Sequence, residues 1–248
     1  MGSNPTPAAS AFVLNAQNPR TVSYIDDSTA NERLLVKVGV TLACLAVLVQ
    51  TALYLIHIHA FDRSVAVLDL EEGGLVTWAT SSATFSVGVV ALLLTFLVSE
   101  ARWRGPAVAV GTAFISFDDA VVLHERVGFE ITGALAISDS YMRIVWPILY
   151  APLLAAVAVL IWQLARGNST ARRLVFGGLL GLAVAIGLEI VGVALDRAGF
   201  NEESWPWTVK AVLEEGVELA GWILIATGVS VRLLACAGDR GRIGSAPT

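Results

Sequence analysis

The sequence predicts an all-α polytopic integral membrane protein, a bundle of six transmembrane helices with both termini in the cytoplasm. Its 248 residues are 56% apolar and only 15% charged, whereas soluble domains carry about 25% charged residues. The mean hydropathy is +0.71. Apolar runs such as 34–57, 87–98 and 174–188 are longer than a soluble surface can cover, so a bilayer is the expected surrounding.

Charge and cysteine content exclude two classes of function. The formal net charge is −5 and no basic patch is interleaved with aromatic residues, which excludes a nucleic-acid binder. Cys44 lies in the first apolar run and Cys236 near the other end of the chain, at depths that cannot be bridged, which excludes a disulfide scaffold. Membrane lipids are the expected partners, and a homo-oligomer or a membrane partner stays open.

Segments long enough to cross a bilayer, about 20 residues or more, occur at six places. In chain order they are 34–60, 75–99, 106–127, 142–165, 173–196 and 207–235. Residues 1–30 contain no apolar signal-peptide core and are predicted to be a flexible cytoplasmic tail. Residues 31–237 form the predicted six-helix domain, and 238–248 a short cytoplasmic tail.

Basic residues gather on one side of these six crossings. They are Arg20, Arg33, Lys37, Arg102, Arg104, Arg166, Arg172, Arg173, Arg232, Arg240 and Arg242. The loops on the opposite side are acidic, with Asp62, Asp69, Glu71, Glu72, Asp139, Glu202 and Glu203. Because Lys and Arg stay on the cytoplasmic side, we expect a plasma-membrane protein with cytoplasmic termini.

Seven carboxylates and one histidine are the candidate site residues within the predicted spans. They are Asp118, Asp119, His124 and Glu125 on the third, Glu189 on the fifth, and Glu214, Glu215 and Glu218 on the sixth. An ionised side chain at mid-bilayer costs about 2.5–3.5 kcal/mol, so such residues usually mark function. The directions of the three spans bring all eight to the outer half. Apart from residues at their ends, such as Lys37 and Arg232, the inner halves of the six spans hold no ionisable residue. This pattern predicts an outward-opening site over an apolar floor.

Helical phase predicts which of these residues can meet, since each residue advances about 100° around the axis. Asp118 and Glu125 share a face of the third span, whereas Asp119 and His124 point to other sectors. The four polar groups of this span therefore should not all enter one small site. The predicted metal ligands are Asp118, His124, Glu125, Glu189, Glu214 and Glu218, and the predicted general bases are Glu215 and Asp119.

Other polar and small residues receive structural interpretations. Of His57 and His59, about 200° apart on the first span, at most one can point inward. The second span has a hydroxyl face that is interpreted as helix packing, made of Thr77, Thr80, Ser81 and Thr84. The small residues Gly177, Gly181 and Ala185 recur at four-residue spacing, which predicts close helix contact.

Three explanations of the acidic cluster stay open. Carboxylates with one imidazole suit a divalent metal ion, and a metal-dependent membrane hydrolase or oxidase acting on a lipid-like or small apolar substrate would follow. Proton or cation transport through the same acids is the alternative. The third is a structural or accessory protein, in which nearby Arg126, Arg143, Arg197 and Lys210 satisfy the acids.

The acidic motifs resemble those of a group of uncharacterised bacterial multi-pass membrane proteins. The residues that carry the resemblance are Ser116-Phe117-Asp118-Asp119, Leu123-His124-Glu125, the lone Glu189, and Glu214-Glu215-x-x-Glu218. The resemblance covers most of the chain from the first span onward and implies a multi-pass fold, but no activity. The histidine pairs of seven-helix membrane hydrolases are missing.

Overall fold

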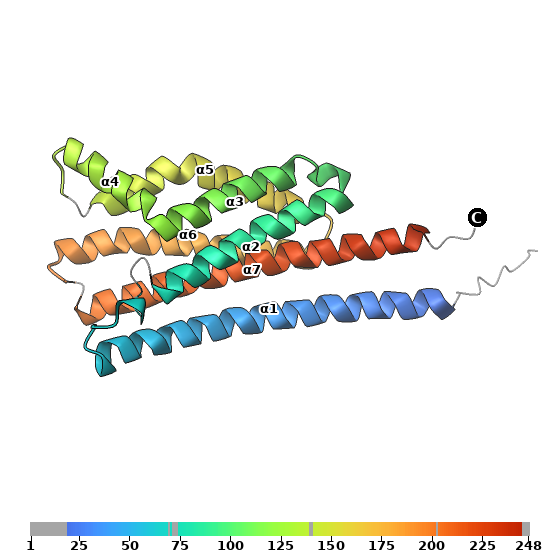
Figure 1. Ribbon diagram of the computed structural model, residues 1–248, viewed down its shortest axis with the longest axis horizontal. Coiled ribbons are helices and arrows are strands. Elements are labelled where there is room, and N and C mark those ends of the chain that lie inside the picture. Colours follow the sequence, from blue (N-terminus) through green and yellow to red (C-terminus); the bar gives the residue numbers. More distant parts are fainter. Residues whose placement is uncertain (1–18, 69, 71–73, 139–140, 202, 245–248) are drawn as a thin grey trace, which may run out of the picture.

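The computed structural model describes residues 19–68, 70, 74–138, 141–201 and 203–244, and contains no strand among them. Long helices lie side by side along the long axis of the molecule (Figure 1). In chain order the elements are α1 (Pro19–Ala60), the short 3-10 helix η1 (Ala66–Leu68), α2 (Leu75–Leu97), the 3-10 helix η2 (Ser99–Ala101), α3 (Arg104–Val121), α4 (Leu123–Ala134), α5 (Met142–Leu164), α6 (Ser169–Arg197) and α7 (Trp205–Gly244).

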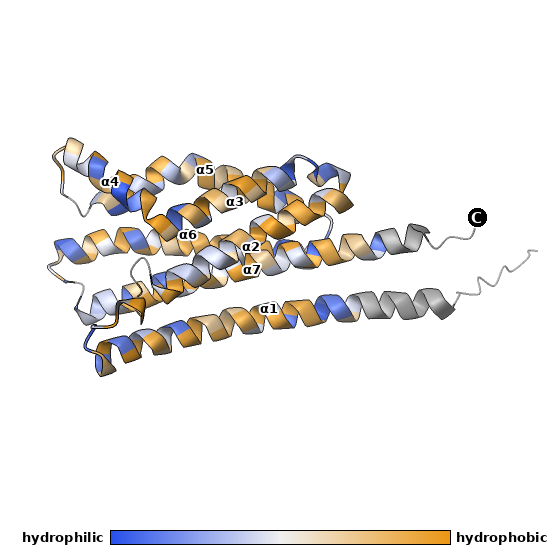
Figure 2. Ribbon diagram, in the orientation of Figure 1, coloured by the Kyte–Doolittle hydropathy of each residue, from blue (hydrophilic) through white to orange (hydrophobic). Residues whose placement is uncertain are grey.

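Five of these helices are long and apolar enough to cross a membrane. They are α1 from Thr29 onward, α2, α5, α6 and α7 to Asp239. The pair α3 and α4 passes the same test only together, bent by 69°, so the described chain has five spans, or six if the bent pair counts as one. Orange apolar residues predominate along the length of these helices in Figure 2. The protein is therefore an all-helical membrane protein.

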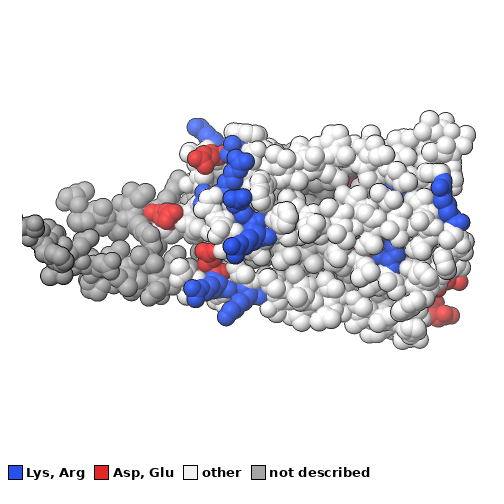
Figure 3. All heavy atoms as spheres, turned by 180° about the vertical axis from the view of Figure 1, so that it is seen from behind, with Lys and Arg blue, Asp and Glu red and all other residues white. Residues whose placement is uncertain are grey.

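The distribution of charge over the surface supports this conclusion. Figure 3 shows Lys and Arg gathered in a band at the end where α1 begins and α7 ends, followed by a broad belt almost without charge. Large apolar side chains of the helices are exposed, including Leu48 at 65%, Phe96 at 69% and Val110 at 72%. Such a continuous apolar surface is stable only against lipid.

Most helices begin and end close to the limits of the predicted spans. The first and last helices extend beyond them. Helix α1 begins at Pro19, within the segment predicted to be a flexible tail, and α7 continues to Gly244, beyond the predicted end at 235. Residues 1–18 and 245–248 lie outside the described part, as do the side chains of Arg20, Arg240 and Arg242. The predicted acidic loop residues Asp69, Glu71, Glu72, Asp139 and Glu202 also lie outside it.

The prediction of one continuous third span over 106–127 is wrong. Val122 lies in the left-handed region, with φ 60° and ψ 35°, and ends α3 before α4 begins. A β-branched residue rarely adopts this conformation, so the surrounding contacts must hold it. A side-chain bond spans the break, from His124 Nδ1 to the Asp118 carboxylate at 2.7 Å. Tyr150 of α5 donates a second bond to Asp118, at 2.8 Å.

Close contact between α6 and α7 depends on two glycines. A Cβ atom on Gly178 would lie 2.5 Å from the Gly221 carbonyl oxygen, and one on Gly221 would lie 2.9 Å from the Gly178 carbonyl oxygen. Gly181 also faces Gly221. The prediction for Gly177 is wrong, because a Cβ there meets nothing within 4 Å. The packing face of α6 therefore includes Gly178 and Gly181 but not Gly177.

This packing predicts different effects of the same substitution at adjacent positions. Gly178→Ala should lower the free energy of unfolding by more than about 1 kcal/mol, because a Cβ has no space between the two backbones. Gly177→Ala should be neutral or stabilising, because alanine favours helices. Thermal unfolding of the two purified variants in one detergent measures the difference, and equal effects would contradict the described helix contact.

Candidate functional site

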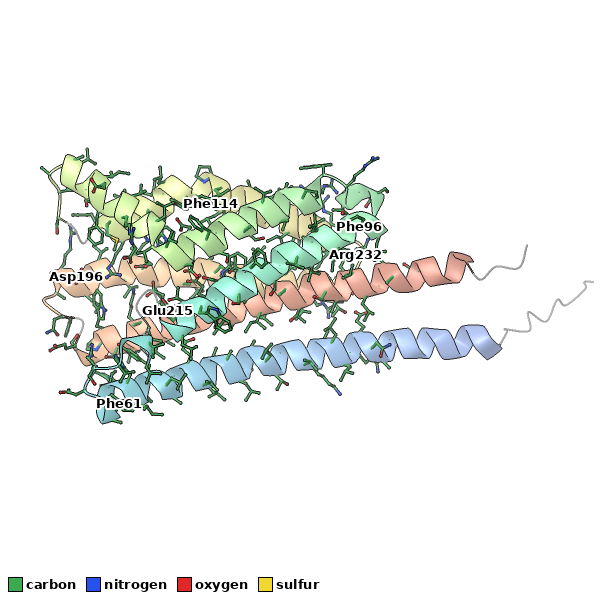
Figure 4. All side chains as sticks on the ribbon, in the orientation of Figure 1. Phe61, Phe96, Phe114, Asp196, Glu215 and Arg232 are labelled. Carbon is green, nitrogen blue, oxygen red and sulfur yellow. The ribbon has the colours of Figure 1, made fainter. Side chains whose placement is uncertain are left out.

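A cavity of about 550 Å³ opens between α3, α4, α5, α6 and α7. All eight ionisable residues predicted from the sequence line it, namely Asp118, Asp119, His124, Glu125, Glu189, Glu214, Glu215 and Glu218. It lies toward the end of the bundle opposite to Arg232, as the label of Glu215 in Figure 4 indicates. Cavities of 300–1,000 Å³ are typical of small-molecule sites.

The bend between α3 and α4 explains why all four polar residues of the third segment reach the cavity. On one straight helix, Asp119 and His124 would point away from the face of Asp118 and Glu125. The break at Val122 resets the helical phase, and Asp118, Asp119, His124 and Glu125 all line the same cavity. The prediction that they cannot share one site is therefore wrong, because it assumed an unbroken helix.

Two cations and two acids form what we call the paired group: Arg143, Glu189, Lys210 and Glu214. Arg143 donates a hydrogen bond to Glu189 at 3.2 Å. The Lys210 ammonium lies 3.6 Å from the same carboxylate and also pairs with Glu214, one helical turn further along α7. Lys210 and Glu214 are both buried. Three helices, α5, α6 and α7, are thus joined by charge in the bundle.

A second polar group surrounds His124 at the helix break. Its Nδ1 lies 2.7 Å from Asp118, and the other Asp118 oxygen accepts the bond from Tyr150. The His124 ring lies against Trp146, with centroids 4.5 Å apart. A carboxylate bonded to one imidazole nitrogen fixes the orientation of the ring. This arrangement holds His124 at the cavity wall.

Three carboxylates form what we call the acid group: Asp119, Glu215 and Glu218. Asp119 accepts a hydrogen bond from Ser81 of α2 at 2.6 Å. Asp119 and Glu215 are both close enough to Glu218 to repel its charge. No ion pair joins any of the three to a lysine or arginine within the described residues. The acid group therefore brings together three carboxyl groups that have no Lys or Arg partner among the described residues.

The charges around the cavity do not balance. Seven carboxylates line it, against three strong cations, Arg63, Arg143 and Lys210, which leaves a formal excess of four negative charges when all are ionised. Like charges in a low-dielectric site repel strongly. Protons or a positively charged ligand would relieve this repulsion.

The predicted metal ligands are only partly free to bind an ion. Glu189 and Glu214 contact Arg143 and Lys210, and Asp118 contacts His124 and Tyr150. Among the described residues, no three His, Cys, Asp or Glu side chains are grouped as a metal site. Binding of a metal ion would require side chains of the paired group and of the group around His124 to rearrange.

Aromatic residues make much of the cavity wall, a position that their spacing in the sequence does not indicate. They are Tyr54, Phe129, Trp146, Tyr150, Trp207 and Trp222. The sequence does not reveal this position for Trp146 and Trp207, because a membrane-interface tryptophan and a cavity tryptophan look alike in a sequence. Trp207 stacks under Arg143, at 5.1 Å, and under Lys210, at 5.6 Å. Ser81 and Tyr150 also lack a distinctive sequence signal.

Below the cavity the bundle is apolar. Trp222 belongs both to the cavity wall and to the main hydrophobic cluster, which continues through Ile225, Val229 and Ile161. On α2, Thr84 bonds its own helix, as predicted for the hydroxyl face, and Ser81 instead reaches Asp119. Of the two histidines of α1, His57 is buried and His59 is exposed, which agrees with the expectation that at most one points inward.

The paired group predicts a large cost for removing its shared cation. Lys210→Met leaves Glu189 and Glu214 without their ammonium in a buried position, so the free energy of unfolding should fall by about 3–5 kcal/mol. Adding Glu214→Gln should recover part of this loss, since one unpaired charge is removed. Unfolding of wild type, both single variants and the double variant measures the coupling, and additive effects would contradict a direct Lys210–Glu214 interaction.

No curated protein and no solved structure shows a significant match to this chain. A family model does match, over residues 34–233, which is most of the chain and includes every cavity residue from Tyr54 to Trp222. The family is described as a domain of unknown function, DUF8692. The chain therefore belongs to the DUF8692 family, whose matched region spans the bundle from α1 to α7.

Proposed function

We propose that this chain is a plasma-membrane protein that binds a small organic cation in its cavity. The observation that carries the proposal is the excess of carboxylates over cations around one cavity, seven against three. The paired group uses two of those cations to neutralise Glu189 and Glu214. The acid group is left for a ligand of opposite charge.

The aromatic wall supports an organic cation. Aromatic faces attract ammonium groups, especially where water is excluded, and together with carboxylates they form the usual recognition site for amines. Trp222 stands at the floor near the acid group, and Tyr54, Phe129 and Trp146 line other parts of the cavity. Because the cavity holds about 550 Å³, it suits a molecule with an apolar body as well as a charged group.

The sequence predicts a divalent metal ion as the ligand. The contacts within the cavity favour it less than an organic cation. Asp118, His124, Glu189 and Glu214, which are among the six predicted ligands of the metal ion, already have partners within the protein. A metal-dependent hydrolase or oxidase with Glu215 and Asp119 as general bases also stays a prediction. Metal analysis of the purified protein would test both predictions.

The orientation that we propose places the termini in the cytoplasm and the cavity on the outer side. The band of Lys and Arg in Figure 3 lies at the end of the bundle where α1 begins and α7 ends, and positive charge favours the cytoplasmic side. A reporter enzyme active only in the cytoplasm, fused after Thr248, should be active in intact cells. An inactive cytoplasmic reporter, together with an active external reporter at the same position, would reverse the orientation.

Transport of the same cation is a second candidate function, favoured by the bend between α3 and α4. Transporters commonly place broken helices at their binding sites. Here the break at Val122 separates Asp118 and Asp119 from His124 and Glu125, and all four line the cavity. The apolar cluster below Trp222 closes the inner side, so this conformation would correspond to an outward-open state.

Binding to the cavity should depend on the charge of the ligand and of the acid group. Wild-type protein in lipid nanodiscs should bind choline more tightly than its uncharged carbon isostere, measured by calorimetry. Glu218→Gln should weaken choline binding by about ten-fold or more, because one nearby charge in a partly buried site is lost. Glu130→Gln is the control, since Glu130 is exposed on α4 and does not line the cavity.

The same preparations separate the competing functions. Equal binding of choline and its isostere, or equal loss in both variants, would contradict the organic-cation proposal. Tight binding of Mn²⁺ or Zn²⁺ that Glu218→Gln abolishes would support the metal prediction instead. Uptake of choline into protein-containing vesicles, absent in the Glu218→Gln vesicles, would extend binding to transport.

A further inference from the structure

A crevice at the opposite end of the bundle is lined by three arginines. Arg104 comes from the start of α3, Arg166 from the turn after α5, and Arg232 from α7. Its volume is about 10 Å³, enough for one water-sized group such as a single oxygen atom. Segments far apart in the sequence therefore place guanidinium groups around one small opening, near the labelled Arg232 in Figure 4.

The charges of this crevice are not balanced within the described chain. Glu100 is its one acidic lining residue, and no ion pair joins Glu100 to a cation there. The Arg104 Nε is buried and has no hydrogen-bond partner among the described residues. Helix α3 begins at Arg104 without a side-chain cap, which adds a partial positive charge. The opening thus has unused donors for an anion.

One guanidinium is held in place by the backbone beside it. Gly167 has φ +91°, and a Cβ there would lie 3.0 Å from an Arg232 guanidinium nitrogen and 3.1 Å from its central carbon. Only glycine adopts this conformation readily and leaves this space. The turn after α5 therefore fits around the Arg232 side chain.

The surroundings indicate a lipid. The floor of the crevice is apolar, formed by Leu94, Val98 and Leu164. Two large apolar side chains near this end are exposed, Phe96 at 69% and Trp103 at 61%. Arg102, Arg172 and Arg173 are also exposed, and Figure 3 shows a band of Lys and Arg at this end of the bundle. An acyl chain can thus lie along the belt while its headgroup meets positive charge.

We infer that this arginine crevice binds the phosphate of an acidic phospholipid headgroup. A phosphodiester oxygen enters the opening between Arg104, Arg166 and Arg232, and the planar guanidinium groups donate to it. Lipids with a compensating positive charge on the headgroup bind less well, because the crevice carries a net charge of about +2 from three arginines and one glutamate. The inference does not depend on the ligand of the cavity.

The test uses the full chain in detergent and native mass spectrometry with added phosphatidylglycerol or phosphatidylcholine. Wild type should retain phosphatidylglycerol preferentially. The double variant Arg104→Gln, Arg232→Gln should weaken phosphatidylglycerol binding by about five-fold for each arginine removed. Arg102→Gln is the matched control, because Arg102 is exposed nearby but does not line the crevice, and it should change binding by about two-fold at most.

Other outcomes overturn the inference. A lack of preference between the two lipids, or an equal loss in Arg102→Gln, would mean that diffuse surface charge attracts lipid. Displacement of phosphatidylglycerol by an equal concentration of inorganic phosphate would mean a free-anion site. If the double variant does not fold, Arg104→Lys and Arg232→Lys keep the charge but lose the planar fork, and retained wild-type binding in both would contradict guanidinium recognition.

Discussion

The contact of Lys210 with Glu189 and Glu214 is the interaction on which the cavity depends. A buried carboxylate in a membrane is costly unless a cation or a proton accompanies it. Lys210 lies one turn before Glu214 on α7 and faces α6, so it neutralises acids of both helices. Arg143 adds the link to α5. Because these four residues are paired, α5, α6 and α7 can pack closely at this level while the cavity stays open beside them.

The depth of the acidic residues could be predicted from the sequence, because it follows from the length and direction of each span. Glu189 and Glu214 approach from helices that run in opposite directions, and a count of residues brings both to one level. The ion-pair partners of these acids could not be predicted in this way. The sequence places Arg143 and Lys210 near the same level, but the rotation of each helix about its own axis determines that both pair with Glu189.

The bend at Val122 is the feature of the fold that is hardest to predict from the sequence. Breaks usually coincide with proline or glycine, and neither lies at this position. The contacts that hold the bend come from Tyr150 on another helix and from His124 beyond the break. Tertiary contacts thus override the helical preference of the local sequence. By resetting the helical phase, the bend gathers polar residues that a straight helix would spread around its circumference.

Helix α7 connects two sites of opposite charge. Glu214 belongs to the cavity, and Arg232 of the arginine crevice lies 18 residues further along the helix, which at ~1.5 Å per residue is about 27 Å. This separation is close to the thickness of the hydrocarbon core, roughly 30 Å. The intervening part of α7 contributes Trp222, Ile225 and Val229 to the apolar core. No ionisable residue lies on α7 between Glu218 and Arg232, so a continuous apolar stretch of this helix separates the acidic cavity from the arginine crevice.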